Sequence, residues 1–391
     1  MESNHASRIF AAAVALCVGM CVPASGAAVA RGTQGALAFF YNPGAAPPRW
    51  GTLSGKPHAA QRAAICFYGL RRLRPIGYLS APEAVAGIAP FNNDFLIAST
   101  SAVPGARPGD LTGRFTIITQ YDPVNGRSIR RRKYNWLMTR IQANGRQTTF
   151  HTAPDGVVWL ARYRLRSGKI TGWLSSLDWA TGRILGSTRY RGNSSIPFVF
   201  AVDGAALLVF ERGRSAEATV VRTNGATLPC LFPRGFRGVP YYMAPCGRRL
   251  DGMSMTGGYF ISIDIGGARA VARERKLVGI QGRPVRGYAA LNSATGVVLL
   301  RSFGGNTCEL IFVSAPTGTV LRRVKVGFPG TKIAVFGGRV FLVSPGGRVA
   351  RCTLRGNIQR VGPPPFGPLG LIRPSTPPAA TRPGGSTQKG G

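Results

Sequence analysis

Carboxylates, histidines and long hydrophobic runs are all scarce in this sequence. Its 391 residues include 14 Asp plus Glu and three His, against 50 Lys plus Arg. Three histidines cannot build a His-rich zinc site, and scattered acids offer little for paired-carboxylate catalysis. Motifs of the GxSxG, HExxH and Walker types are missing as well. These shortages argue against the common hydrolytic and metal-dependent chemistries, and we expect no metal and no cofactor.

An excess of positive charge is the most unusual feature of the composition. The formal net charge is +36, and Arg outnumbers Lys by 43 to 7. A surface this positive attracts polyanions through long-range fields and counterion release. The expected partner is an anionic polymer or an acidic protein surface, with anionic lipid and nucleic acid as alternatives.

The first thirty residues resemble a secretory signal peptide. Arg8 precedes a 14-residue apolar run over residues 9–22, and small residues follow at Ala28-Val29-Ala30. The run is shorter than the roughly 20 residues that span a bilayer. We expect residues 1–30 to be a cleaved signal peptide, with an uncleaved N-terminal anchor as the alternative, and no transmembrane span in the mature chain. The predicted localisation is secreted or extracytoplasmic, in the cell envelope, where nucleic acid is the least expected partner.

A four-strand unit recurs along residues 31–361. Its clearest copy, residues 148–190, reads as four apolar strands separated by an Asp-Gly turn, a loop and a second turn. The first turn recurs near Asp94, Gly156, Gly204, Gly257, Gly296 and Gly338. Asp-Gly and Asn-Gly pairs favour the positive φ of tight hairpins, and sheets this small must pack against neighbours. The pattern predicts an all-β fold, a β-propeller with seven four-stranded blades; six or eight blades are the alternatives.

The last thirty residues have a different composition. Residues 362–391 are rich in Pro, Gly, Ser and Thr and keep no apolar period. Such a segment cannot bury enough apolar surface to fold, so we expect a disordered tail.

Four turn segments carry a resemblance to a known family. They are LDWATGRIL (177–185), LNSATGVVLL (291–300), SAPTGTVL (314–321) and YDPVNGRSI (121–129). These segments look like the Asp-x-x-Thr-Gly signature of bacterial PQQ-like and YVTN-type β-propellers, and the resemblance implies architecture only. The quinoprotein repeat carries a Trp shortly after that Gly, whereas this chain has Leu185, Gly186 and Ser187. No quinone cofactor is therefore expected.

The acidic residues are mostly accounted for by turns. Six of the eight Asp lie at or beside repeat turns, where they can cap backbone amides: Asp94, Asp122, Asp155, Asp178, Asp203 and Asp264. We assign no catalytic residue and expect a non-catalytic binding or scaffold module. A secreted lyase or hydrolase is the first alternative, and its few candidate groups are Asp110, Glu211, Glu217, Asp251 and His151. A structural component of a cell-surface assembly is the second alternative.

Two basic segments are the candidate binding surfaces. Residues 231–249, which we expect to form a loop between blades, contain Phe232, Arg234, Phe236, Arg237, Tyr241, Tyr242, Arg248 and Arg249. Aromatic and basic residues interleaved in this way suit stacking plus phosphate or carboxylate contacts; packing of the aromatics on a sheet edge is the equal alternative. The second segment is Arg127, Arg130, Arg131, Arg132 and Lys133, on an outer strand. Its preferred alternative is a charged edge strand that discourages aggregation.

Five cysteines follow the predicted signal peptide. In an oxidising compartment Cys230 and Cys246 could close a disulfide across the 231–249 segment. Cys308 and Cys352 fall in third strands of neighbouring units, where buried thiols are expected. No CxxC pair supports zinc.

Overall fold

The computed structural model describes most of the chain between residues 28 and 364. The described ranges are 28–30, 36–41, 63–81, 85–102, 114–139, 141–143, 146–166, 169–190, 196–212, 215–232, 239–254, 258–277, 280, 285–301 and 306–364. Every regular element in these ranges is a β-strand. Most of the predicted tail (362–391) and most of the predicted signal peptide lie outside them. No helix in the described part is long and apolar enough to cross a membrane.

The strands follow one another in groups of four antiparallel neighbours, here called sheets 1 to 7. Sheet 1 contains β1 (Ala28–Ala30), β2 (Ala36–Tyr41), β3 (Ala63–Gly69) and β4 (Arg74–Ala81). Sheet 2 contains β5 (Val85–Phe91), β6 (Asp94–Ala102), β7 (Arg114–Asp122) and β8 (Arg127–Tyr134). Sheet 3 contains β12 (Phe150–Thr152), β13 (Val157–Arg166), β14 (Lys169–Asp178) and β15 (Arg183–Tyr190).

The C-terminal half repeats the same order. Sheet 4 contains β16 (Phe198–Val202), β17 (Ala205–Arg212), β18 (Ser215–Arg222) and β19 (Thr227–Leu231). Sheet 5 contains β20 (Pro240–Cys246), β21 (Arg249–Ser254), β22 (Tyr259–Asp264) and β23 (Ala270–Lys276). Sheet 6 contains β24 (Val285–Ala290), β25 (Thr295–Arg301), β26 (Cys308–Ser314) and β27 (Val320–Val326). Sheet 7 contains β28 (Lys332–Phe336), β29 (Arg339–Val343), β30 (Val349–Cys352) and β31 (Ile358–Val361).

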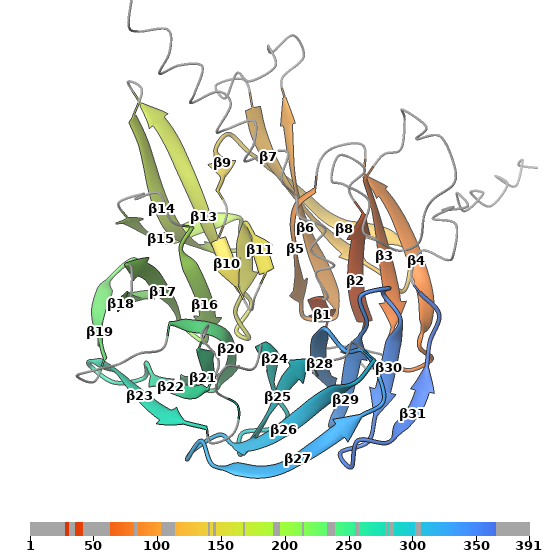
Figure 1. Cartoon of the computed structure of the whole chain (residues 1–391). Coiled ribbons are helices and arrows are strands. Elements are labelled where there is room, and N and C mark those ends of the chain that lie inside the picture. Colours follow the sequence, from red (N-terminus) through yellow and green to blue (C-terminus); the bar gives the residue numbers. More distant parts are fainter. Residues whose placement is uncertain are drawn as a thin grey trace, which may run out of the picture.

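The sheets are arranged around a common centre (Figure 1). First strands of neighbouring sheets contact one another, so the first strand of each sheet is innermost and the fourth is outermost. The predicted all-β propeller fold is confirmed. Outermost strands β19 and β23 also pair in parallel, Cys230 opposite Ala270, which joins sheets 4 and 5 into one. The number seven therefore counts four-strand groups rather than separate sheets.

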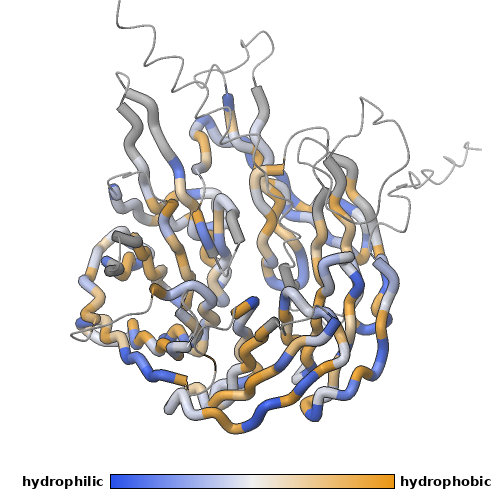
Figure 2. The backbone as a smooth tube through the Cα atoms, viewed as in Figure 1, coloured by the Kyte–Doolittle hydropathy of each residue, from blue (hydrophilic) through white to orange (hydrophobic). Residues whose placement is uncertain are grey.

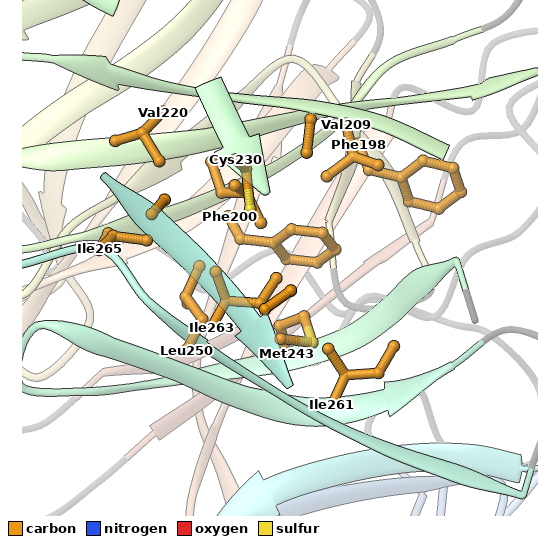
Figure 3. Packing of buried hydrophobic residues seen from close by; sticks show 14 of the residues in the cluster. Phe198, Phe200, Val209, Val220, Cys230, Met243, Leu250, Ile261, Ile263 and Ile265 are labelled. Carbon is orange, nitrogen blue, oxygen red and sulfur yellow. The ribbon is translucent and has the colours of Figure 1, made fainter. Parts of the chain in front are cut away.

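Seven hydrophobic clusters hold the ring together, one between each pair of neighbouring sheets. Figure 3 shows the cluster between sheets 4 and 5, where Phe200 packs near Ile263 and Met243. The cluster that contains Phe39 and Phe341 joins sheet 1 to sheet 7 and closes the circle. Each sheet is too small to bury both faces alone, so neighbours supply the missing core.

A hydrogen bond reinforces the closure between the two chain ends of the ring. The buried Tyr68 hydroxyl lies 2.7 Å from the Leu73 carbonyl oxygen and 3.1 Å from that of Pro363. Pro363 directly follows the last sheet, so Tyr68 connects sheet 1 to sheet 7. No strand of sheet 1 pairs with a strand of sheet 7 in the described ladders. The ring is therefore closed by side-chain packing and not by a shared sheet.

One connection adds an inner hairpin that the repeat did not predict. Between sheets 2 and 3 lie β9 (Leu137–Met138), which pairs with β13, and the hairpin of β10 (Ile141–Ala143) and β11 (Arg146–Thr148). Strand β10 pairs with innermost strand β16 through Gln142 and Phe198. The hairpin therefore lies on the channel side of sheet 4.

Four of the six turn acids cap backbone amides as predicted: Asp122, Asp155, Asp178 and Asp264. Asp94 instead accepts a hydrogen bond from the Gln120 side chain. Asp178 Oδ1 accepts the Ala180 amide at 2.8 Å, and Asp122 and Asp264 make equivalent bonds in their own turns. Gly182 and Gly126 follow with φ of +79° and +67°. The predicted inner turn near Gly257 is wrong. Sheet 5 turns instead at Gly247, with φ +61°, because its first strand begins earlier than the repeat suggested.

The Asp178 cap predicts a pH-dependent stability. A hydrogen bond from the Thr181 hydroxyl, together with backbone amides, holds the pKa of Asp178 below its usual value. A carboxylate with a lowered folded pKa stabilises the fold above its unfolded pKa, near 4, and this contribution is lost as the pH falls through the folded value. We expect Asp178→Ala to cost about 0.5 to 1 kcal/mol at pH 7, a value kept small by solvent exposure, and almost nothing near pH 2. Urea unfolding at both pH values measures this, with Asp203→Ala, an exposed turn residue, as control; an equal loss at both pH values would contradict the capping role.

Candidate anion-binding surface

Positive charge is concentrated on the outermost strands. The seven outermost strands contain fifteen Lys and Arg residues and one carboxylate, Glu274, whereas the innermost strands contain two cations and no carboxylate. The fifteen are Arg74, Arg127, Arg130, Arg131, Arg132, Lys133, Arg183, Arg189, Arg273, Arg275, Lys276, Arg322, Arg323, Lys325 and Arg360. All but Arg132 are exposed. Hydrophilic stretches run along β23 and β27 on the outside of the ring (Figure 2). We call these fifteen residues the basic rim.

The predicted basic run lies on β8 and has a role that the sequence did not suggest. Arg130 and Arg132 donate hydrogen bonds to backbone carbonyl oxygens of the outer turn of sheet 3, at Trp179 and Ala180, over 2.7 to 3.1 Å. The Arg132 guanidinium also lies 5.8 Å from the centre of the Trp179 ring. Arg130 and Arg132 therefore connect sheet 2 to sheet 3 through hydrogen bonds. Arg127 and Arg131 are exposed on the surface.

Arginine hydrogen bonds of this kind also connect other neighbouring sheets. Arg275 on β23 donates to the Thr317 carbonyl oxygen at 2.8 Å, and Arg322 on β27 donates to that of Leu354. Arg222, at the end of β18, reaches Gly267 at 3.1 Å. In each case an arginine of one sheet binds the outer turn of the next sheet. Part of the arginine excess is therefore structural, and the exposed remainder of the rim adds positive charge to the surface.

Large exposed apolar side chains accompany the rim cations. Ile129, Leu185 and Leu321 each lie three residues after a turn glycine, on an outermost strand, and are 47 to 57% exposed. Val271 and Ile358 occupy similar places on β23 and β31. Scattered single apolar residues are normal on a protein surface, but here each lies within two residues of a cation on the same strand. The rim can therefore combine apolar contact with anion binding.

The prediction that residues 231–249 form one loop between blades is wrong. Residues 240–246 form innermost strand β20, and residues 233–238, with Arg234, Phe236 and Arg237, lie outside the described residues. Phe232 and Tyr241 pack against the core between sheets 4 and 5, Tyr241 edge-on to Phe198. These two aromatic side chains therefore pack on the sheets, which was the alternative to a binding role.

The basic end of this segment is separated from its aromatic end. Arg248 and Arg249 follow β20, at the opposite end of the strand from Phe232. Tyr242 lies between them and lines a cavity at the ring centre. The eight predicted residues therefore do not form one surface, because a strand of seven residues separates the two groups.

The predicted disulfide between Cys230 and Cys246 is not formed, and both thiols are free. Cys230 lies on outermost strand β19, while Cys246 ends innermost strand β20. Three strands separate β19 from β20 in the sheet order, which places them roughly 19 Å apart at the usual spacing between strands. That separation is far beyond the reach of a disulfide. Cys308 and Cys352 are buried in one core cluster, as expected.

The candidate catalytic groups do not converge in the described part of the chain. Asp251 is fully buried and pairs with Arg249 at 2.9 Å, Glu217 is exposed on β18, and His151 lines the central cavity. Burial raises the pKa of Asp251, against hydrogen bonds from Ser262 and Arg249. Asp110 and the Glu211 side chain lie outside the described residues. No group of three His, Cys, Asp or Glu side chains that could hold a metal occurs among the described residues.

A cavity of about 670 Å³ lies at the centre of the ring. Innermost strands β5, β12, β20, β24 and β28 line it, together with their adjoining turns. Strand β16 does not line it, which agrees with the β10–β11 hairpin covering that strand on the channel side. This volume is typical of a site for a small organic ligand.

Solved structures similar to this chain share its fold. One is a functionally unknown protein from Desulfotomaculum acetoxidans DSM 771, with a TM-score of 0.51 and 9% identity over 76% of this chain and 91% of that one. Another is Sqt1 from Saccharomyces cerevisiae, with a TM-score of 0.50 and 12% identity over 87% of this chain and 86% of that one. No family model and no curated protein matches the chain. At such identities the likeness shows the β-propeller fold alone, and the PQQ-like or YVTN type stays a prediction.

Proposed function

We propose that this protein is an exported, non-catalytic binding or scaffold module whose basic rim engages an anionic polymer or an acidic partner protein. The observation that carries the proposal is the uneven distribution of charge across the ring, with fifteen cations and one carboxylate on the outermost strands and two cations on the innermost strands. Extracytoplasmic localisation is part of the proposal and is supported by the signal-like residues 1–30.

The acids near the rim are too few to offset this charge, although Asp122 and Asp178 lie close enough to Arg127 and Arg132 to interact with them. Asp122, Asp178 and Asp264 are engaged in turn caps, and Asp251 is buried against Arg249. A surface of one sign concentrates polyanions near it, with an affinity that falls steeply with salt. The exposed aliphatic residues between the rim cations suit a partner that also offers apolar groups, as an acidic protein does.

A salt titration with charge-matched variants tests the proposal. The rim variant is Arg273→Gln/Lys276→Gln/Lys325→Gln, three exposed cations on adjacent sheets 5 and 6. The control is Arg248→Gln/Arg339→Gln/Arg348→Gln, which removes the same charge from exposed positions off the outermost strands. The probes are a sulfated polysaccharide and polyglutamate. Binding is measured between about 50 and 300 mM salt, a range over which the Debye length falls through about 10 Å and exposed charges become screened.

We expect the rim variant to reduce the slope of log affinity against log salt by about one per engaged cation, and the control to reduce it little. The probe that binds more tightly at the same salt concentration identifies polymer or protein as the better partner. Equal loss in both variants would show that net charge alone attracts the probes. Absence of binding to both probes at 50 mM salt would reject the proposal.

A further inference from the structure

Strand β8 forms an open edge of sheet 2. It is the last strand in the order of that sheet, and among the described strands it pairs with β7 alone. No backbone–backbone hydrogen bond joins β8 to a described residue outside β7. In an antiparallel ladder, every second residue of an edge strand directs its amide and carbonyl groups away from its neighbour. Strand β8 therefore offers a row of backbone donors and acceptors with which a further strand can pair.

The C-terminal part of this edge is regular. The ladder shifts register between Gln120 and Tyr121, which leaves Ile129 as the extra residue of a bulge. From Arg130 to Tyr134 the residues of β8 then pair with β7 without a break. A stretch of about five residues is the usual length of a strand, so this part of the edge can hold a partner strand.

The charge of β8 is the highest among the outermost strands. It contains five cations and no carboxylate, whereas no other outermost strand has more than three cations. The Arg130 and Arg132 side chains are engaged with the outer turn of sheet 3. Arg131 and Lys133 lie on the opposite face, are exposed, and alternate with that pair along the strand, with the Lys133 ammonium 3.9 Å from the centre of the Phe115 ring. An added strand would therefore meet Arg131 and Lys133 at every second position on one face.

This charge decides which strand suits the edge. Like charges directly opposite each other in a sheet are destabilising, so β8 of a second copy of this chain is disfavoured, and the net charge of +36 adds to the repulsion. A strand with carboxylates at the facing positions is favoured instead. An outermost strand of this ring already accepts a further strand, since β19 pairs with β23 at Cys230 and Ala270. A polysaccharide has no row of backbone amides and would use only the charge of β8.

We propose that the edge of β8 from Arg130 to Tyr134 binds an extended acidic segment of a partner protein by strand addition, with carboxylates at alternate positions beside Arg131 and Lys133. In this mode of recognition main-chain hydrogen bonds give the affinity and alternate side chains give the specificity. The proposal rests on the proposed function of the basic rim, and it names an acidic protein segment as the partner.

Three peptides of equal charge test the proposal with the full chain. The first is Glu-Thr-Glu-Thr-Glu-Thr-Glu, which presents its carboxylates on one face of an extended strand. The second and third carry N-methyl groups on the amides of every Glu or of every Thr, so that one edge of the peptide strand can no longer donate hydrogen bonds. Affinity is measured by calorimetric titration at about 50 mM salt, where exposed charges are little screened. A sulfated polysaccharide is titrated alongside as the measure of binding to the rim.

We expect the unmodified peptide to bind. One methylated peptide should bind at least about 10-fold more weakly and the other within about 3-fold, because only one edge of the peptide strand pairs with β8. Equal affinity of all three peptides, or equal weakening of both methylated forms, would overturn strand addition while the rim proposal stands. Binding of the polysaccharide without the unmodified peptide would also overturn it and would identify a polymer as the partner. Failure of the peptides and the polysaccharide together would reject the proposed function itself.

Two double variants locate the site. Arg131→Gln/Lys133→Gln should weaken binding of the unmodified peptide by about 3-fold to 10-fold, as expected for two exposed ion pairs. The control Arg248→Gln/Arg339→Gln removes the same charge from exposed positions off the outermost strands and should weaken it by less than about 2-fold. Equal weakening by both variants would contradict a site on β8. Amide hydrogen exchange gives a second measurement, since the peptide should slow exchange in residues 127–134; unchanged exchange there would overturn the proposal.

Discussion

Gly186→Ala is expected to lower the free energy of unfolding by about 3 kcal/mol, since overpacking against a backbone cannot be relieved by a rotamer change. Gly186 on β15 faces the outer turn of sheet 4. A Cβ there would lie 2.3 Å from Asn224 C and Gly225 N and 2.4 Å from Thr223 O, all of them backbone atoms. The clash would also separate Thr188 from the Gly225 carbonyl oxygen, which its hydroxyl binds at 2.7 Å. Urea unfolding at pH 7 measures the change.

Gly327→Ala is the matched control for this clash. A Cβ at Gly327 would have no atom within 4 Å, and its φ is not positive. We expect a change within about 0.5 kcal/mol. If both alanine variants unfold at the same urea concentration, sheets 3 and 4 do not approach as closely as the structure has them.

Asp251→Ala is expected to cost about 3 kcal/mol, the lower end for removing one partner of a buried ion pair. Asp251 has no exposed surface, and Arg249 Nε lies 2.9 Å from each of its carboxylate oxygens. The variant leaves a guanidinium that is 30% exposed and only partly hydrated. Unfolding by urea at pH 7 gives the loss.

The double variant Arg249→Met/Asp251→Leu distinguishes the cost of an unpaired charge from the cost of lost packing at this position. Replacing both partners with apolar groups removes the uncompensated charge, and such replacements are often close to neutral. We expect it to regain at least half of the stability that Asp251→Ala loses. A double variant less stable than Asp251→Ala would mean that packing, and not charge, accounts for the loss.

Local sequence patterns predicted most of the fold. The apolar strands and the Asp-x-x-x-Gly turns depend on neighbouring residues alone, so the Asp178 and Asp122 caps could be predicted from the sequence. Strand β20 was missed because its sequence, PYYMAPC, contains Pro240 and Pro245, and proline within a run argues against a central strand. The β10–β11 hairpin was missed because strands of three residues show no alternation.

The candidate site was less predictable, because it depends on contacts between sheets. The sequence drew attention to the run around Arg130, but the role of Arg130 and Arg132 requires the position of the next sheet's outer turn. The excess of positive charge is visible in the composition. Its concentration on the outermost strands could have been predicted by comparing the fourth strand of each repeat with the first.

Strand β1 is formed by the last three residues of the predicted signal peptide. Residues 28–30 pair with Ala36–Ala38 and form the inner edge of sheet 1, and they are also the small residues of the proposed cleavage site. A peptidase that cut after Ala30 would take this strand away and leave the β2 backbone facing the channel with unpaired amides and carbonyls. Under the proposed export, processing and completion of the first sheet would compete for the same three residues, and the mass of the N-terminus of the purified protein distinguishes the two outcomes.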